Sequence, residues 1–269
     1  MYSRIELFGW PEPASADSGI ARIVSAHGDY FHVVCNEAER EVIARKKKSA
    51  FLSPDAKKPI TGDFVKIRYN PNGESFITDV LERYSVFERR DPTARRKSQV
   101  LAVNFDTLFI MMSMNANFSI PRLERYLALA EDLGRAEPVV ILTKKDLTDN
   151  IPALPDLGGV RVIAMSSVTG VGIDEVRKIV QPRKTVAFIG SSGVGKSTLL
   201  NVLAGENWMA TQEIQEWSGK GRHTTTSREL VMLPCGAMII DTPGIREIGI
   251  VGEQEFELAK GASSHRWRG

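Results

Sequence analysis

The chain has 269 residues, 42% of them hydrophobic, and its 35 Lys and Arg nearly balance its 33 Asp and Glu. Length and composition predict about two domains, each with a packed core, and the formal charge of +2 argues neither for nor against a nucleic-acid partner. The longest apolar run, near residues 108–112, is far too short to span a bilayer, and the N-terminus lacks the apolar core of a signal peptide. We therefore expect a soluble cytoplasmic protein with no membrane partner.

The two cysteines, Cys35 and Cys235, stand far apart in the sequence and lack metal-ligand spacing. They exclude a disulfide framework and a zinc site built from cysteines. We expect both to be small buried hydrophobic residues.

The first part of the chain predicts a small β-barrel. Residues 1–18 carry two prolines and show no sustained period, so we expect a flexible lead-in. Within residues 19–81, short stretches rich in strand formers alternate with turn residues. These stretches lie at 20–24, 30–35, 41–44, 65–69 and 76–80. Five short strands are typical of the OB-fold, so we expect an OB-like barrel.

The charge distribution favours RNA binding by this barrel. Residues 40–97 hold 15 Lys and Arg against 8 Asp and Glu, with basic runs at 45–48 and 95–97. The first run follows the third predicted strand, where a loop would project. OB-folds commonly bind oligonucleotides, although a fold alone does not establish a function. The alternative is a barrel that only braces the next domain.

Residues 82–98 are a charged connector marked by Pro92, and we place the domain boundary there. Beyond it, buried strands alternate with helices. Strands are predicted at 107–113 and 139–142, and a helix begins near Pro121. This alternation predicts a parallel α/β domain over residues 99–255, followed by a tail at 256–269.

A phosphate-binding loop is the most specific motif. It follows a β-branched strand at 185–189 and opens a helix at 196–204. Its residues are Gly190, Ser191, Ser192, Gly193, Val194, Gly195, Lys196, Ser197 and Thr198. The glycines turn backbone N–H groups inward, Lys196 offers a charge to the β- and γ-phosphates, and the Ser197 hydroxyl is placed to bind magnesium. The alternative, a glycine-rich turn that binds nothing, is disfavoured by the flanking strand and helix.

Two earlier stretches predict a guanine site. Thr143, Lys144, Lys145 and Asp146 follow a strand, and Ser166 and Ser167 follow the next one. The Asp146 carboxylate accepts two hydrogen bonds from guanine, whereas adenine offers no such pair of donors. The Lys144 stem is expected to cover the purine, and the serine loop to donate a backbone N–H to the base carbonyl.

Two later stretches resemble nucleotide switches. Residues 221–226 offer Thr225, uncertain by one position, as a magnesium ligand, and His223 lies in the same stretch. Asp241 ends a strand and is placed to hold the magnesium shell, while the Gly244 N–H would sense the γ-phosphate. Together with the phosphate loop, these motifs predict a site for GTP or GDP with magnesium.

The order of the motifs is unusual because the base-reading residues precede the phosphate loop. The domain therefore looks circularly permuted. With its OB-like barrel, the entry strand at 103–106 and the motifs above, the chain resembles the RsgA (YjeQ) family over about residues 19–260. This resemblance implies GTP hydrolysis stimulated by the small ribosomal subunit, with the barrel contacting rRNA in late maturation, in a monomeric protein.

Two features depart from the family pattern. Members continue into a zinc module with cysteine and histidine ligands, whereas this sequence ends at Gly269, just after His265. No zinc is expected, and we predict a mobile second switch and weakened ribosome docking. In addition, Thr143 replaces the asparagine usual in GTPases, which removes one hydrogen bond.

The sequence does not identify the residue that orients the attacking water. Ile245 occupies the position of the usual glutamine, so His223 or a group supplied by the ribosome would orient the water. The alternative is that His223 only structures its loop. Two other functions compete: a nucleotide-responsive RNA-binding scaffold with no turnover, and an ATP-using kinase or ATPase, which Asp146 disfavours.

Overall fold

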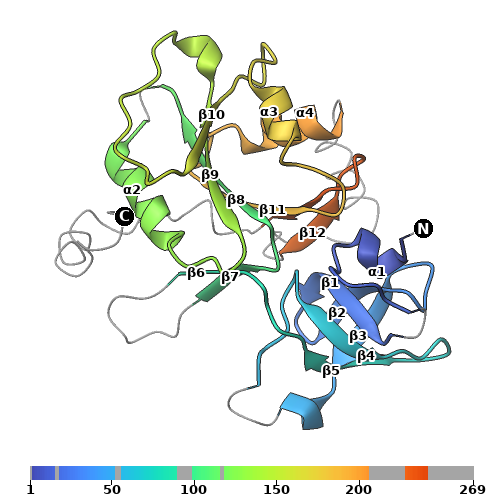
Figure 1. Cartoon of the computed structure of the whole chain (residues 1–269). Coiled ribbons are helices and arrows are strands. Elements are labelled where there is room, and N and C mark those ends of the chain that lie inside the picture. The colour runs from blue at the N-terminus through green and yellow to red at the C-terminus, as the bar shows by residue number, and fades with distance from the viewer. Residues whose placement is uncertain are drawn as a thin grey trace.

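The structure is a computed structural model that describes residues 2–15, 18–51, 56–89, 99–115, 118–205 and 228–241. It has a barrel in the N-terminal part and an α/β sheet in the remainder (Figure 1). No helix within these ranges is long and apolar enough to cross a bilayer.

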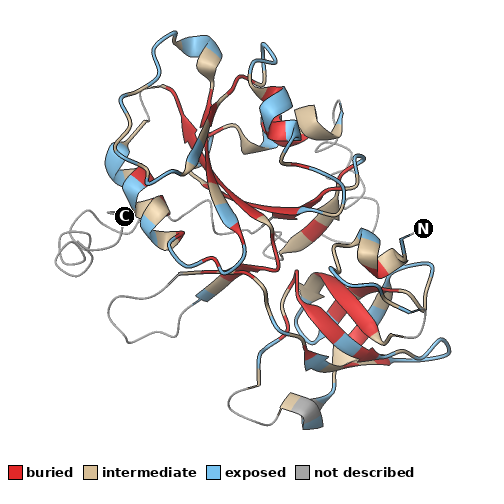
Figure 2. Cartoon of the chain, viewed as in Figure 1, coloured by how far each residue is buried: buried red, intermediate tan, exposed pale blue. Residues whose placement is uncertain are grey.

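The five predicted strands form the barrel. They are β1 (Ile20–His27), β2 (Tyr30–Cys35), β3 (Val42–Lys46), β4 (Phe64–Arg68) and β5 (Ser75–Val80). Strand β1 pairs with β2 and with β4, and the β3–β5 and β4–β5 pairs close the barrel. Alternate residues of these strands form the barrel core, in which Ile23, Val33 and Ile77 are fully buried. Figure 2 shows that much of the barrel strands is buried. Cys35 belongs to this core, but Cys235 is exposed, contrary to our expectation.

Residues expected to form a flexible lead-in contain a short helix, α1 (Arg4–Leu7). Ile5 of this helix is fully buried, and its backbone N–H donates to Asn36 Oδ1 at 2.8 Å. The sequence analysis missed this helix, although Ser3 and Glu6 have capping-box spacing and the Ser3 N–H donates to Glu6 Oε2 at 2.6 Å.

The basic run at 45–48 differs from the predicted projecting loop. Arg45 and Lys46 belong to β3, and a single 3-10 turn, η1 (Lys48–Phe51), follows. The Arg45 guanidinium lies 4.4 Å from the centre of the Tyr30 ring. Part of the basic charge is therefore carried by the barrel wall beside an exposed aromatic ring.

The second part is the expected parallel sheet. Its parallel strands are β10 (Arg161–Ala164), β9 (Glu137–Thr143), β8 (Thr107–Ser113), β11 (Thr185–Gly190) and β13 (Met238–Asp241), in that spatial order. Helix α2 (Ile120–Leu129) packs on one face, and α3 (Ile173–Arg177) and α4 (Lys196–Ala204) pack on the other. Strand β8 shows the division, because Leu108 and Ile110 face α2 while Phe109 and Met111 face α4.

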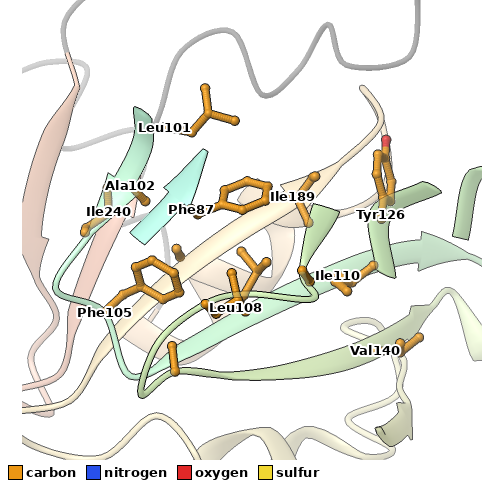
Figure 3. Packing of buried hydrophobic residues seen from close by; sticks show 14 of the residues in the cluster. Phe87, Leu101, Ala102, Phe105, Leu108, Ile110, Tyr126, Val140, Ile189 and Ile240 are labelled. Atoms are coloured by element: carbon orange, nitrogen blue, oxygen red, sulfur yellow. The ribbon is translucent and has the colours of Figure 1, made fainter. Parts of the chain in front are cut away.

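A hairpin crosses the boundary expected at residue 98. It consists of β6 (Val86–Arg89) and β7 (Gln99–Val103), which pair antiparallel. Figure 3 shows Phe87 and Leu101 of this hairpin in one cluster with Leu108 and Ile189 of the sheet. Of the expected entry strand at 103–106, only Val103 lies in a strand, as the last residue of β7, and the chain bends at Asn104, which has a φ of 52°.

Strand β12 (Glu229–Met232), which the sequence did not indicate, joins the two parts. It pairs antiparallel with β13, and its Glu229 pairs with Ser25 of β1. Among the described residues, eleven strands thus form one continuous sheet from β10 to β4.

Candidate functional site

The carboxyl ends of the parallel strands place the predicted motifs along one edge. The chain runs outward through β8, β9 and β10 and then returns to the other side of β8 with β11. Ligands of open parallel sheets bind where the strand order reverses in this way. The end of β9 and the end of β11 therefore flank a crevice, and these are the positions of the base motif and the phosphate loop.

The phosphate loop surrounds a cavity of about 600 Å³. Gly193 and Gly195 have left-handed backbones, with φ of 71° and 100°, and Gly195 is the N-cap of α4. A helix N-terminus with such a loop presents backbone N–H groups and a positive dipole end to an anion. The lining comprises Met111, Lys144, Phe188, Ile189, Gly190, Ser191, Ser192, Gly193, Val194, Gly195, Lys196, Ser197 and Thr198.

Of the base-motif residues, Lys144 is the one that lines this cavity. Its backbone is left-handed, with φ 62° and ψ 38°. A residue with a side chain pays about 1–2 kcal/mol for this conformation. Such strain collects at ligand sites, where the surrounding structure enforces it. The turn directs the chain from β9 into the short helix η2 (Lys145–Leu147), which carries Asp146.

Asp146 is held by Ser166. The Ser166 hydroxyl is fully buried and donates to Asp146 Oδ1 at 2.5 Å. The same hydroxyl oxygen accepts the N–H groups of Val168 and Thr169 at 3.2 and 3.1 Å. Two of the three amides after Ser166 are thus occupied, which leaves the Ser167 amide as the candidate donor to a base carbonyl. This network fixes a carboxylate and the adjoining loop as one unit.

Thr143, which replaces the asparagine usual in GTPases, makes a contact that the sequence analysis did not predict. Its hydroxyl is buried and donates to the Val194 carbonyl at 2.6 Å, with the Met112 carbonyl at 3.3 Å. Thr143 therefore ties the end of β9 to the phosphate loop. The replacement of asparagine has not left the position without a polar contact.

Met111 and Phe188 also line the cavity, and the sequence did not indicate them. Both lie on buried strands whose neighbours cannot be read from local spacing. The pairing of Met111 with Gly190 places β8 directly beneath the phosphate loop.

The positions proposed for magnesium offer hard oxygen ligands, which magnesium prefers. Ser197 is exposed in the first turn of α4 and borders the cavity. Asp241 is the last residue of β13, the strand beside β11. The predicted residues His223, Thr225 and Gly244 lie outside the described residues, as does the tail at 256–269.

Comparisons with known proteins point to one family. The RsgA GTPase family model matches residues 80–251. The chain is 42% identical over 236 residues to small ribosomal subunit biogenesis GTPase RsgA 2 of Lactiplantibacillus plantarum, covering 86% of this chain and 66% of that protein. It is 38% identical over 268 residues to small ribosomal subunit biogenesis GTPase RsgA of Methanosarcina acetivorans, covering 95% and 71%. The chain thus spans about two thirds of the length of the first of these relatives.

Solved structures give the same result for the fold. YjeQ from Thermotoga maritima superposes with a TM-score of 0.61 at 25% identity, covering 84% of this chain and 74% of that chain. YloQ, described as a circularly permuted GTPase, superposes with a TM-score of 0.56 at 22% identity, covering 86% and 73%.

Proposed function

Because the chain belongs to the RsgA family of circularly permuted GTPases, we propose that it binds GTP and hydrolyses it to GDP and phosphate. One observation carries the proposal: the phosphate loop and Lys144 line one cavity, and Asp146, two residues after Lys144, is held by a buried serine. The loop suits a polyphosphate, and Asp146 suits the donor edge of guanine.

Phosphoryl transfer depends mainly on positioning and charge neutralisation. Amides of the loop and the Lys196 ammonium bind the β- and γ-phosphates, and α4 adds its positive end. Magnesium, when bound, would be held by Ser197, Asp241 and Thr225 and would neutralise charge on the phosphate oxygens. Gly244 is proposed to bind the γ-phosphate through its N–H. Thr143 and Ser166 contribute indirectly, because they hold the loop and Asp146 in position.

A group that orients the attacking water is also needed. We propose His223 for this role, since Ile245 offers no polar atom where other GTPases have glutamine. His223→Ala should leave GDP affinity unchanged and lower stimulated turnover by about 100-fold, a typical contribution of one positioned acid–base group. An unchanged turnover rate would assign the water to a group outside this chain.

The partner proposed from the relatives' names is the small ribosomal subunit. In this proposal the barrel binds the rRNA of the subunit. The protein acts as a monomer in the cytoplasm. Exposed Tyr30 with Arg45 over its ring, and Lys46 at 5.8 Å from the Phe51 ring, combine cationic and aromatic groups as single-stranded RNA sites do. Tyr30→Ala should weaken subunit binding and leave nucleotide binding unchanged.

Calorimetry and turnover measurements test the nucleotide function. We expect GDP and GTP to bind with magnesium far more tightly than ADP and ATP, and small subunits to accelerate phosphate release. Asp146→Ala should abolish the preference for guanine, whereas Asp149→Ala, at an exposed position of the same loop, should retain it. Guanine preference that survives Asp146→Ala would contradict the site. Binding without phosphate release in any condition would indicate an RNA-binding scaffold instead of a hydrolase.

A further inference from the structure

The barrel loop at residues 60–63 contacts the start of β12 and the end of β13, which pair with each other. The Thr61 side chain is buried, and its hydroxyl donates to the Arg228 carbonyl at 2.9 Å, immediately before β12. A Cβ added to Gly62 would lie 3.1 Å from Ile240 Cδ1, and Ile240 directly precedes Asp241. One short loop of the barrel therefore lies against the start of β12 and against Ile240, the residue before the proposed magnesium ligand Asp241.

This loop is fixed to the rest of the barrel. Asp63 is fully buried and binds the Arg83 guanidinium through two hydrogen bonds of 2.7 and 2.8 Å. Its Oδ2 also accepts the Ile60 N–H at 2.9 Å, and the Gly62 N–H donates to Ile23 of β1 at 2.9 Å. A buried bidentate pair is strongly destabilising to break. The loop and β1 are thus expected to move together.

The surrounding contact is packed and continuous. Val24 and Val34 of the barrel belong to the same buried cluster as Leu230 of β12 and Ile240 of β13. Arg22 of β1 is fully buried, and its Nη2 donates to the Asn104 carbonyl at 2.6 Å. Close-packed interiors transmit displacement because no voids absorb it. A shift at the start of β12 or the end of β13 would therefore also displace β1.

We propose that Thr61 is a positioning residue that couples the barrel to the nucleotide site through β12 and β13. The proposal rests on the nucleotide binding proposed above. It adds that the conformation of the barrel loop and the affinity for nucleotide depend on each other. Such coupling is reciprocal, so a nucleotide that alters the strand ends must alter the barrel loop, and a partner on the barrel must alter nucleotide affinity.

Hydrogen exchange on the full chain tests this, with magnesium and either GDP or a non-hydrolysable GTP analogue. We expect the segment 60–64 and β1 to exchange about fivefold more slowly with the analogue, the equilibrium effect of about one hydrogen bond. Thr61→Val should abolish this difference, and Thr61→Ser should retain it. Thr78→Val is the matched control, because the Thr78 hydroxyl donates to the Lys66 carbonyl within the barrel at 3.2 Å.

The outcomes separate this proposal from the function. If calorimetry shows that both nucleotides bind but the barrel exchanges equally in both states, the coupling is wrong and the nucleotide function stands. If neither nucleotide gives heat, both proposals fail. If Thr61→Val behaves like Thr78→Val, Thr61 does not carry the coupling.

Discussion

Replacement of Thr143 by valine removes the hydroxyl that supports the phosphate loop and preserves the shape of the side chain. The Val194 carbonyl then loses a donor at 2.6 Å in a buried position. Leaving a buried acceptor without its partner costs about 1–3 kcal/mol. That range corresponds to about 5- to 150-fold in an equilibrium constant. Because the same bond also stabilises the loop before nucleotide arrives, we expect the lower end, about fivefold weaker GDP binding.

Isothermal titration with GDP and with IDP, which lacks the guanine amino group, separates loop support from base reading. If Thr143 acts only through the loop, Thr143→Val weakens both ligands equally and their affinity ratio is unchanged. Asp146→Ala should instead bring the GDP-to-IDP affinity ratio close to one. Thr143→Ser keeps the hydroxyl and should bind within about twofold of the parent. Thr148→Val is the control, because the Thr148 hydroxyl donates an exposed hydrogen bond to the Asn150 carbonyl. A changed ratio in Thr143→Val with little loss of affinity would refute the reasoning.

Three further predictions use other contacts. Gly190→Ala should abolish GDP binding, because its Cβ would lie 2.9 Å from a carbonyl of β8 and force the loop to move; retained affinity by titration would contradict this. Ser166→Ala should lower the GDP-to-IDP affinity ratio about tenfold by freeing Asp146, the loss of one charge-assisted hydrogen bond. Burial raises the pKa of the Cys35 thiol to about 11, so at pH 8 mass spectrometry should find alkylation at exposed Cys235 alone, and early labelling of Cys35 would refute its burial.

Local spacing explains how much of this site could be predicted. The phosphate loop and the Asp146 motif could be predicted because each is contiguous and follows a strand. The contact from Thr143 to Val194 could not be predicted, because it joins residues 51 positions apart. Its physical origin is the pairing of both β9 and β11 with β8, which no local pattern encodes.

The fold shows the same limit. Strands of the barrel were predicted from alternation, but β12 has only four residues and depends on its partners β1 and β13. Likewise, α1 depends on burial of Ile5 against the barrel. Elements that need distant partners are poorly indicated by propensity alone.

Protein synthesis delivers residues 20–205 before residues 228–241, although the later strands lie between β11 and the barrel. Until β12 and β13 emerge, β11 lacks a neighbour on one side, and the cluster that joins Val24 to Ile240 stays open. Pairing over such a long separation forms slowly. A nascent chain that ends before residue 228 should therefore fail to retain GTP, and the finished nucleotide pocket would appear only once nearly the whole described chain has left the exit tunnel.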